Sequence, residues 1–305
     1  MYGEMSVFSK ICVGTNFSPE ADRALESAAD LARMFRAEVL VVHVVEVPRL
    51  YQRILSPVQS RLRSVEEASE RAAERCRTLV AAPYWEGVPV DYQIRTGVPF
   101  VDLIDAARIA HADLILLGHR ARLGAQRLLL GSTAERVLRK ATLPVLIAKK
   151  TFDREPRSIL APTDLSEGSE PALQVAAALA GCWGARLTLL HVVEPVAQAD
   201  VWPLDSTKVE LFLAEPEELE PEWQIAIQKV QLSSVNFERR TLKGSAAIEI
   251  TRTADEIGAD LIVMGTHGRS GLVHALLGSV AEQVAREAGC SVLTVRPKEF
   301  RFALP

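Results

Sequence analysis

Short hydrophobic runs alternate along the chain with longer segments in which hydrophobic positions recur every three to four residues. The runs KICVGT, EVLVVHVV, DLILLG and PVLIA are rich in β-branched residues and contain little alternation, which is typical of strands buried on both faces. Segments 18–37 and 99–112 have helical spacing instead. In the first of them, the hydrophobic positions on one face are Ala21, Leu25, Ala28, Leu31 and Ala32. This alternation predicts an α/β protein in which helices flank a parallel sheet and ligands bind beyond the carboxyl ends of the strands.

The pattern occurs twice. KICVGTNFSPEADRAL corresponds to SILAPTDLSEGSEPAL, HADLILLGHR to GADLIVMGTH, and LLLGSTAERV to ALLGSVAEQV. We therefore predict a tandem of two equivalent domains, 1–151 and 156–299, joined near KKTFDREPRS.

The two copies differ after their second strand. Residues 58–80 form a charged amphipathic pattern that predicts a long helix. The corresponding stretch of the second copy contains Pro203, Pro216 and Pro221, and proline inside a helix costs about 3 kcal/mol or more. We expect an irregular acidic segment there, a candidate lid, followed by a shorter helix at 221–232.

Composition narrows the class of protein. The 305 residues are 48% hydrophobic and 24% charged, which favours two globular domains. There is no long uncharged apolar run, and the start is too polar for a signal peptide, so a soluble cytoplasmic protein is expected. The cysteines have no C-x-x-C pair and are expected to be small apolar core residues, not zinc, redox or disulfide sites. They are Cys12, Cys76, Cys182 and Cys290.

Charge is distributed unevenly between the copies. The net charge is −4, with 21 Lys and Arg against 17 Asp and Glu in residues 1–150, and 14 against 22 in residues 151–305. Neither balance indicates binding to nucleic acid, which needs a concentrated basic face.

Glycines surround one predicted strand end. Gly265 follows the run ADLIVM, Gly268 comes three residues later, and Gly278 precedes Ser279 after nine further residues. Ser279 with Glu282 is interpreted as a capping box at the start of a helix. Free amides at a helix start bind anions, and glycine lets a phosphate approach them, so a phosphate chain is the predicted ligand. The alternative is that the glycines only shape turns and Ser279 only caps the helix.

Three stretches together resemble a known family. APTDLSE (161–167), LLHVVE (189–194) and GTHGRSGLVHALLGS (265–279) are similar to the universal stress proteins, whose nucleotide-binding members carry G-x2-G-x9-G-[S/T]. The repeated elements cover nearly the whole chain, which resembles a tandem universal stress protein. The resemblance implies two Rossmann-like domains of the adenine nucleotide alpha hydrolase type, each with a five-stranded parallel sheet. It also implies ATP at the strand ends and association of domains through their last strands.

The resemblance also implies a set of nucleotide contacts in the second domain. Asp164 would accept hydrogen bonds from adenosine, because a carboxylate offers only acceptors, and the main chain of Val192 would contact the adenine edge. Two further residues are suggested by the loop itself and not by the resemblance: Arg269 either clamps a phosphate or is a solvated surface residue, and His267 either contacts a phosphate or lies in an exposed turn. Mg²⁺ is expected only together with ATP. The expected site consists of Pro162, Thr163, Asp164, Val192, Met264, Gly265, His267, Gly268, Arg269, Gly278, Ser279 and Val280.

The first domain departs from this pattern. Asn16 replaces Asp164, Ala121 replaces Gly268, and Gly14 stands where the second copy has Pro162, although Gly118, Gly131 and Ser132 remain. We therefore expect one occupied site, in the second domain. The first loop also carries Arg120, Arg122 and Arg127, which would attract another anion or face an acidic partner.

No catalytic or metal site is expected. His43 and His191 recur at one strand position, but no nucleophile has a fixed relation to them, so they are interpreted as buried, hydrogen-bonded histidines. His111, His119, His267 and His274 lack ligand spacing. Trp183, Trp202 and Trp223 are interpreted as packing residues.

Three functions stay open at this point. The first is an ATP-binding regulatory protein of the stress response. The second is an interaction module that forms a pseudo-dimer within the chain and binds no nucleotide, and the third is a slow ATPase. A homodimer and an unidentified protein partner are compatible with the first two, while nucleic acid and membrane are not expected partners.

Overall fold

The computed structural model describes residues 7–46, 58–119, 130–194, 216–230, 232–233, 235–266 and 277–296, the side chains of 58–62 and 216–217 excepted. The chain divides into two compact units between Arg154 and Glu155. Across the described ranges, no helix combines the length and the apolarity needed to cross a bilayer.

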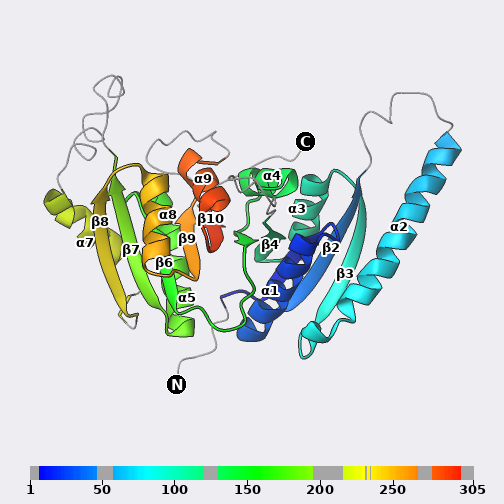
Figure 1. Cartoon of the computed structure of the whole chain (residues 1–305), viewed down its shortest axis with the longest axis horizontal. Coiled ribbons are helices and arrows are strands. Elements are labelled where there is room, and N and C mark those ends of the chain that lie inside the picture. Colours follow the sequence, from blue (N-terminus) through cyan, green and yellow to red (C-terminus); the bar gives the residue numbers. More distant parts are fainter. Residues whose placement is uncertain are drawn as a thin grey trace. The chain divides into compact units, whose positions relative to one another are not determined.

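The first unit is a five-stranded parallel sheet with the strand order β3-β2-β1-β4-β5 (Figure 1). Its elements are β1 (Lys10–Thr15), α1 (Pro19–Phe35), β2 (Glu38–Glu46), α2 (Val58–Val80), η2 (Pro83–Trp85), β3 (Val90–Gly97), α3 (Pro99–Ile109), β4 (Leu114–Gly118), α4 (Ser132–Lys140) and β5 (Val145–Ala148).

The second unit repeats this order as β8-β7-β6-β9-β10, again with parallel pairs throughout. Its elements are β6 (Ser158–Pro162), η3 (Glu167–Ser169), α5 (Glu170–Trp183), β7 (Arg186–Val193), η5 (Pro216–Leu219), α7 (Glu220–Gln228), β8 (Phe237–Lys243), α8 (Ala246–Glu256), β9 (Leu261–Gly265), α9 (Ser279–Glu287) and β10 (Ser291–Val295). The predicted fold class, two tandem Rossmann-like domains with flanking helices, is confirmed.

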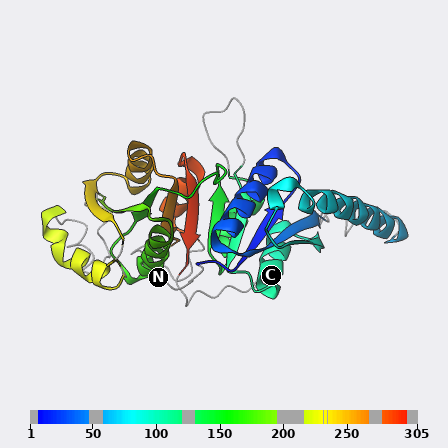
Figure 2. The same ribbon diagram turned by 90° about the horizontal axis from the view of Figure 1, so that it is seen from below.

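Helices cover both faces of each sheet, so the central strands are buried on both sides (Figure 2). All five residues predicted to face the core from α1 are buried. This helix begins where the sequence favours it, because Ser18 Oγ accepts a hydrogen bond from the Ala21 amide (3.3 Å) and Pro19 occupies the first turn. It ends at Arg36, whose φ of 53° is left-handed.

The regions that differ between the copies agree in part with expectation. The long helix α2 has the predicted bounds, 58–80. Helix α7 ends at Gln228, short of the predicted 232, because the chain turns there and the Val230 amide donates to the Ile227 carbonyl. The proposed lid, including Trp202 and Pro203, lies outside the described residues.

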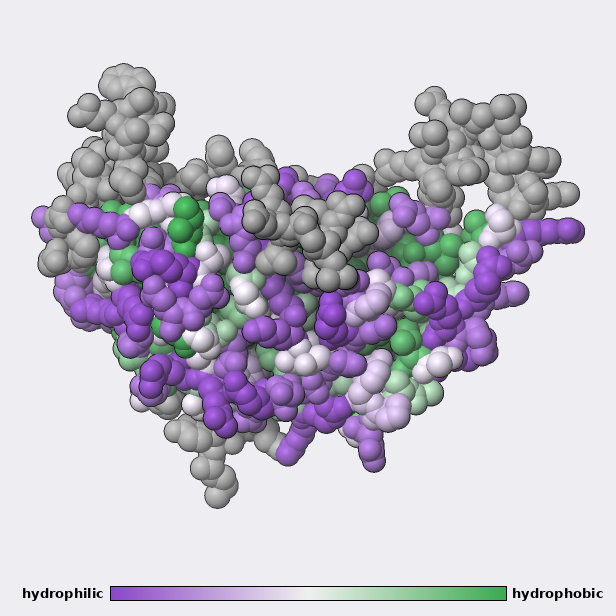
Figure 3. Space-filling view, in the orientation of Figure 1, coloured by the Kyte–Doolittle hydropathy of each residue, from purple (hydrophilic) through white to green (hydrophobic). Residues whose placement is uncertain are grey.

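The edge strands β3 and β8 were not among the predicted hydrophobic runs, because they are only partly buried and mix polar with apolar residues. One cysteine also departs from expectation. Cys182 is exposed on α5, whereas Cys12, Cys76 and Cys290 are buried as predicted. On the face shown in Figure 3, the described residues are mainly hydrophilic and the hydrophobic ones form small separate groups.

Candidate functional site

The candidate site lies at the carboxyl edge of the second sheet, where β6 and its neighbour β9 both end. From β6 the chain continues towards β7 on one side, and from β9 it continues towards β10 on the other. Such a reversal leaves a crevice beyond the strand ends in open α/β sheets. Strand ends and one helix start contribute the described members of the predicted site: Pro162, Thr163, Asp164, Val192, Met264, Gly265, Gly278, Ser279 and Val280. His267, Gly268 and Arg269 lie outside the described residues.

The loop after β6 is fixed by its own side chains. Thr163 Oγ1 accepts a hydrogen bond from the Leu165 amide (3.0 Å) and lies 2.8 Å from Ser169 Oγ. Leu165 has a φ of 61°, a left-handed conformation that costs a side-chain-bearing residue about 1 kcal/mol or more. Phe17, its counterpart in the first domain, has a φ of 60°, so this strained turn belongs to the fold of both copies.

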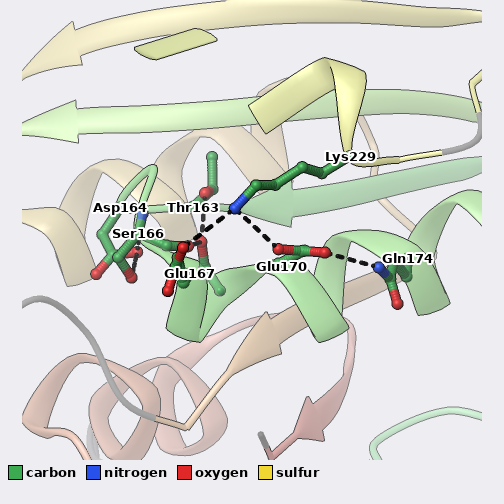
Figure 4. A network of polar contacts seen from close by, with 8 residues as sticks. Thr163, Asp164, Ser166, Glu167, Glu170, Gln174 and Lys229 are labelled. Carbon is green, nitrogen blue, oxygen red and sulfur yellow. Dashed lines mark hydrogen bonds and ion pairs between the residues drawn. The ribbon is translucent and has the colours of Figure 1, made fainter. Parts of the chain in front are cut away.

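Asp164 differs from its counterpart in the first domain, which is Asn16. Its Oδ1 atom accepts hydrogen bonds from the Ser166 amide (3.1 Å) and from Ser166 Oγ (2.7 Å) (Figure 4). Its Oδ2 atom is buried and has no hydrogen-bond partner among the described residues. A buried carboxylate oxygen without a donor is unfavourable, so this atom would gain from a donor that a ligand supplies.

Asn16 makes the same turn in the first domain but does not provide a buried acceptor like Asp164 Oδ2. Its Oδ1 accepts from the Ser18 amide (3.1 Å), and its side chain is exposed. Ser18 Oγ caps α1, whereas the equivalent Ser166 Oγ bonds to the carboxylate. The turn is therefore common to both domains, and the buried acceptor is specific to the second.

The main chain of Val192 faces the β6 side of β7, beyond the end of β6. The Thr163 amide donates to the Leu190 carbonyl (2.8 Å), so Leu190 faces β6, and the Gly244 amide donates to the Val193 carbonyl (3.1 Å), so Val193 faces β8. Because main-chain groups alternate between the two sides of a strand, those of Val192 face the β6 side, beyond the last paired residue of β6. Within the described residues, β6 gives Val192 no ladder partner on that side.

His191 supports the loop after β6. It is buried, and its Nδ1 lies 2.8 Å from the Thr163 carbonyl oxygen, which confirms the interpretation as a hydrogen-bonded histidine. Trp223 of α7 approaches it edge-on with 6.4 Å between ring centroids. The Trp223 Nε1 group donates to Thr241 Oγ1 (3.0 Å), so this residue packs as predicted and fixes α7 over the histidine.

In the first domain, different side chains pack around the equivalent histidine, His43. His43 Nδ1 lies 2.9 Å from the Thr15 carbonyl oxygen, its ring lies 4.3 Å from that of Phe17, and the Arg75 guanidinium lies 4.1 Å above Phe17. Burial lowers the pKa of His43 below 6.5, and the nearby Arg75 charge also lowers it.

The start of α9 corrects one prediction. Gly278, not Ser279, is the N-cap, and no side chain caps the helix, so the capping box is wrong. Glycine and serine are both common N-caps, and here the chain enters the helix one residue earlier than the serine suggested. The Gly278 amide donates to the Thr266 carbonyl (2.7 Å), which brings the two ends of the glycine loop together. The helix start is left without a side-chain acceptor, as an anion site requires.

The glycines of the motif have different roles. A Cβ on Gly118 would lie 2.3 Å from the Glu20 carbonyl oxygen, so this glycine lets the first turn of α1 pack against β4. Gly131, the N-cap of α4, has nothing within 4 Å of such a Cβ. The presence of Gly118 in the first domain is therefore explained by packing and not by a phosphate.

Lys229 is a neighbour of the site that sequence reasoning missed. Its Nζ lies 3.4 Å from Glu167 Oε1 and 3.4 Å from Glu170 Oε2, next to the loop that carries Asp164 (Figure 4). Hydrogen bonds to these carboxylates raise the pKa of Lys229. Only the fold brings this lysine to α5, since it lies 62 residues from Glu167 in the chain.

Comparison with known sequences decides the family. The sequence model described as the universal stress protein family matches residues 8–149 and 156–296. The chain belongs to this family. A universal stress protein of Mycolicibacterium smegmatis is 31% identical over 300 residues, which cover 94% of this chain and 97% of that one. A universal stress protein of Mycobacterium tuberculosis (strain ATCC 25618 / H37Rv) is 28% identical over 304 residues, with 94% and 96% covered.

Solved structures agree on the fold of both domains together. A universal stress protein from Archaeoglobus fulgidus DSM 4304 matches with a TM-score of 0.72 and 21% identity, over 96% of this chain and 99% of that chain. This universal stress protein is thus a tandem of two family domains.

Proposed function

We propose that this protein is a regulatory nucleotide-binding protein of the stress response whose second domain binds ATP and whose first domain does not. The observation that carries the proposal is the buried Oδ2 atom of Asp164, which has no donor among the described residues. Asp164 follows β6 at the carboxyl edge of the sheet, where ligands bind in open α/β folds, and the main-chain groups of Val192 that β6 leaves unpaired face the same side of β7.

The described groups suit the separate parts of an adenine nucleotide. The Asp164 carboxylate would accept a hydrogen bond from adenosine, and the Val192 main chain offers a donor and an acceptor to the base. The uncapped start of α9 and the exposed hydroxyl of Ser279 would receive phosphate oxygens. Contacts from His267, Gly268 and Arg269 stay predictions, and Mg²⁺ would enter only with the triphosphate.

We propose that the regulatory signal is whether ATP is bound, and that ATP hydrolysis is slow or absent. The titratable groups described near Asp164 are already engaged: His191 with the Thr163 carbonyl, and Lys229 with the carboxylates of Glu167 and Glu170. A group held in this way is poorly placed to activate water. Pairing of the two domains within the chain also stays a prediction.

The first experiment is to unfold the purified protein in acid and identify released nucleotide by chromatography, with its molar ratio to chain. We expect about one ATP per chain, or one-to-one binding in calorimetry if the purified protein is empty. Absence of nucleotide, together with no binding when ATP and Mg²⁺ are added, would refute the proposal and favour an interaction module.

A further inference from the structure

A second, unassigned pocket lies at the opposite edge of the second domain, where β6, β7 and β8 begin. It has a volume of about 580 Å³ and is lined mainly by polar side chains. The charged ones are Arg157, Arg186, Arg240, Glu238 and Glu256. Because parallel strands all begin at this edge, it is separated from the carboxyl edge by the length of the sheet.

The two glutamates of this pocket are already paired. Glu238 Oε1 accepts from Arg240 (2.7 Å) and from Thr188 Oγ1 (3.1 Å), and Glu256 Oε1 lies 2.7 Å from Arg252. The guanidinium groups of Arg157 and Arg186 remain, and neither has an ion pair or hydrogen bond with a residue that the structure describes. The Asp260 carboxylate accepts from the Arg157 and Ser158 main-chain amides (2.7 and 3.1 Å), so the two guanidinium groups, both on exposed residues, keep their donors available to a ligand.

These two arginines are neighbours. The Arg186 amide donates to the Arg157 carbonyl (2.9 Å), and Arg186 is in register with Ser158. The helices α5 and α8 end nearby, and positively charged side chains commonly stabilise the carboxyl ends of helices. In the described residues neither guanidinium donates to a helix carbonyl, so a ligand would not have to displace such a bond.

From this arrangement we infer that the pocket binds a small anion bearing two or more phosphate or carboxylate groups. Guanidinium groups bind such oxyanions through paired hydrogen bonds, and Asn236, on the same wall, offers a further donor. This site does not depend on the proposed nucleotide, which belongs to the other edge.

The first domain provides an internal comparison. At the positions equivalent to Arg157, Arg186 and Arg240 it has Ser9, Glu38 and Gln93. Glu38 pairs with Lys10 at 3.2 Å, so this edge neutralises its own charge. The exchange of Glu38 for Arg186 therefore restricts the anion site to the second domain.

The experiment is a calorimetric titration of the full chain with pyrophosphate and, separately, with citrate, at low and high salt. We expect one-to-one binding that weakens in high salt, because charge pairs near the surface are screened. Binding of pyrophosphate alone identifies a phosphate ligand, binding of citrate alone a carboxylate ligand, and binding of both the shared oxyanion chemistry.

The variants use residues that the first domain already tolerates. Arg157→Ser with Arg186→Glu should weaken binding by about tenfold or more, since each removes a charge-assisted contact. Arg23→Glu, at an exposed position of α1, changes net charge as much as Arg186→Glu alone and should leave the affinity unchanged. Circular dichroism checks that each variant is folded. No saturable binding of either anion, or binding that survives the double variant, would overturn the proposal.

Discussion

Replacing Asp164 with Asn tests the nucleotide site with the smallest structural change. Asn retains the Oδ1 acceptor, which receives hydrogen bonds from the Ser166 amide and hydroxyl, and Asn16 makes the same turn in the first domain. The change replaces only the buried Oδ2 atom, which has no donor among the described residues. The unliganded fold should therefore keep its free energy of unfolding, or gain slightly, because an unpaired charged atom leaves a buried position.

The expected loss in binding follows from the charge of the acceptor. A hydrogen bond to a charged group contributes about 1.5–3 kcal/mol, so ATP affinity should fall by about 10- to 150-fold in calorimetry. Denaturation with and without ATP gives a second measure. ATP at about 100 times the wild-type Kd should add about 2.7 kcal/mol to the wild type, and only about 0.4 kcal/mol to a variant that binds 100-fold more weakly.

A matched control separates local charge from the specific contact. Glu167→Gln also removes one carboxylate near the site, but the Glu167 side chain is 92% exposed and contacts Lys229. We expect less than about a twofold change in affinity, because exposed ion pairs contribute little. If Asp164→Asn binds ATP as tightly as the wild type, the assignment of Oδ2 to the ligand is wrong.

Three further predictions concern the fold. Gly118→Ala should lower the free energy of unfolding in urea by about 1–3 kcal/mol, because its Cβ would meet the Glu20 carbonyl oxygen at 2.3 Å, and an unchanged midpoint would contradict this packing. Gly131→Ser should raise the free energy of unfolding by about 0.5–1 kcal/mol, since φ is −63° and the Cβ position is open; a loss of stability would show a hidden clash. Burial lowers the pKa of His43 below 6.5, so the unfolded state binds its proton first and stability should fall as pH falls below 6.5; His43→Gln should flatten that decrease in urea titrations, and an unaltered slope would assign it to other groups.

The order of strands and helices could be predicted because both copies carry strong hydrophobic patterns. Buried runs such as DLILLG indicate a strand, and the corresponding run in the second copy indicates the same strand again. The edge strand β3 could not be found in this way, because its residues are only partly buried or exposed and therefore form no continuous hydrophobic run. Cys182 shows the same limit, because a small apolar residue in a helix does not specify which side it faces.

The site could be predicted where chemistry depends on local sequence, and not where it depends on contacts across the fold. Asp164 follows a strand in the sequence, so its position at the carboxyl edge was foreseeable. The lack of a donor at Oδ2 was not, because it depends on which neighbours reach that atom. The same holds for Lys229, which reaches Glu167 from another part of the chain. The helix start was misassigned by one residue, since Gly278 and Ser279 are both acceptable caps.

Comparison of the two copies separates what the fold needs from what a ligand needs. Three features occur in both domains. They are the left-handed turn at Phe17 and Leu165, the histidine bonded to the strand-end carbonyl, and the glycine N-cap of α4 and α9. Features shared in this way cannot by themselves indicate a nucleotide. The groups that differ, Asp164 against Asn16 at one edge and Arg186 against Glu38 at the other, are those that change an acceptor or a charge while the backbone stays the same. These differences, more than the glycines that first suggested a phosphate, are where substitutions should change binding without changing the fold.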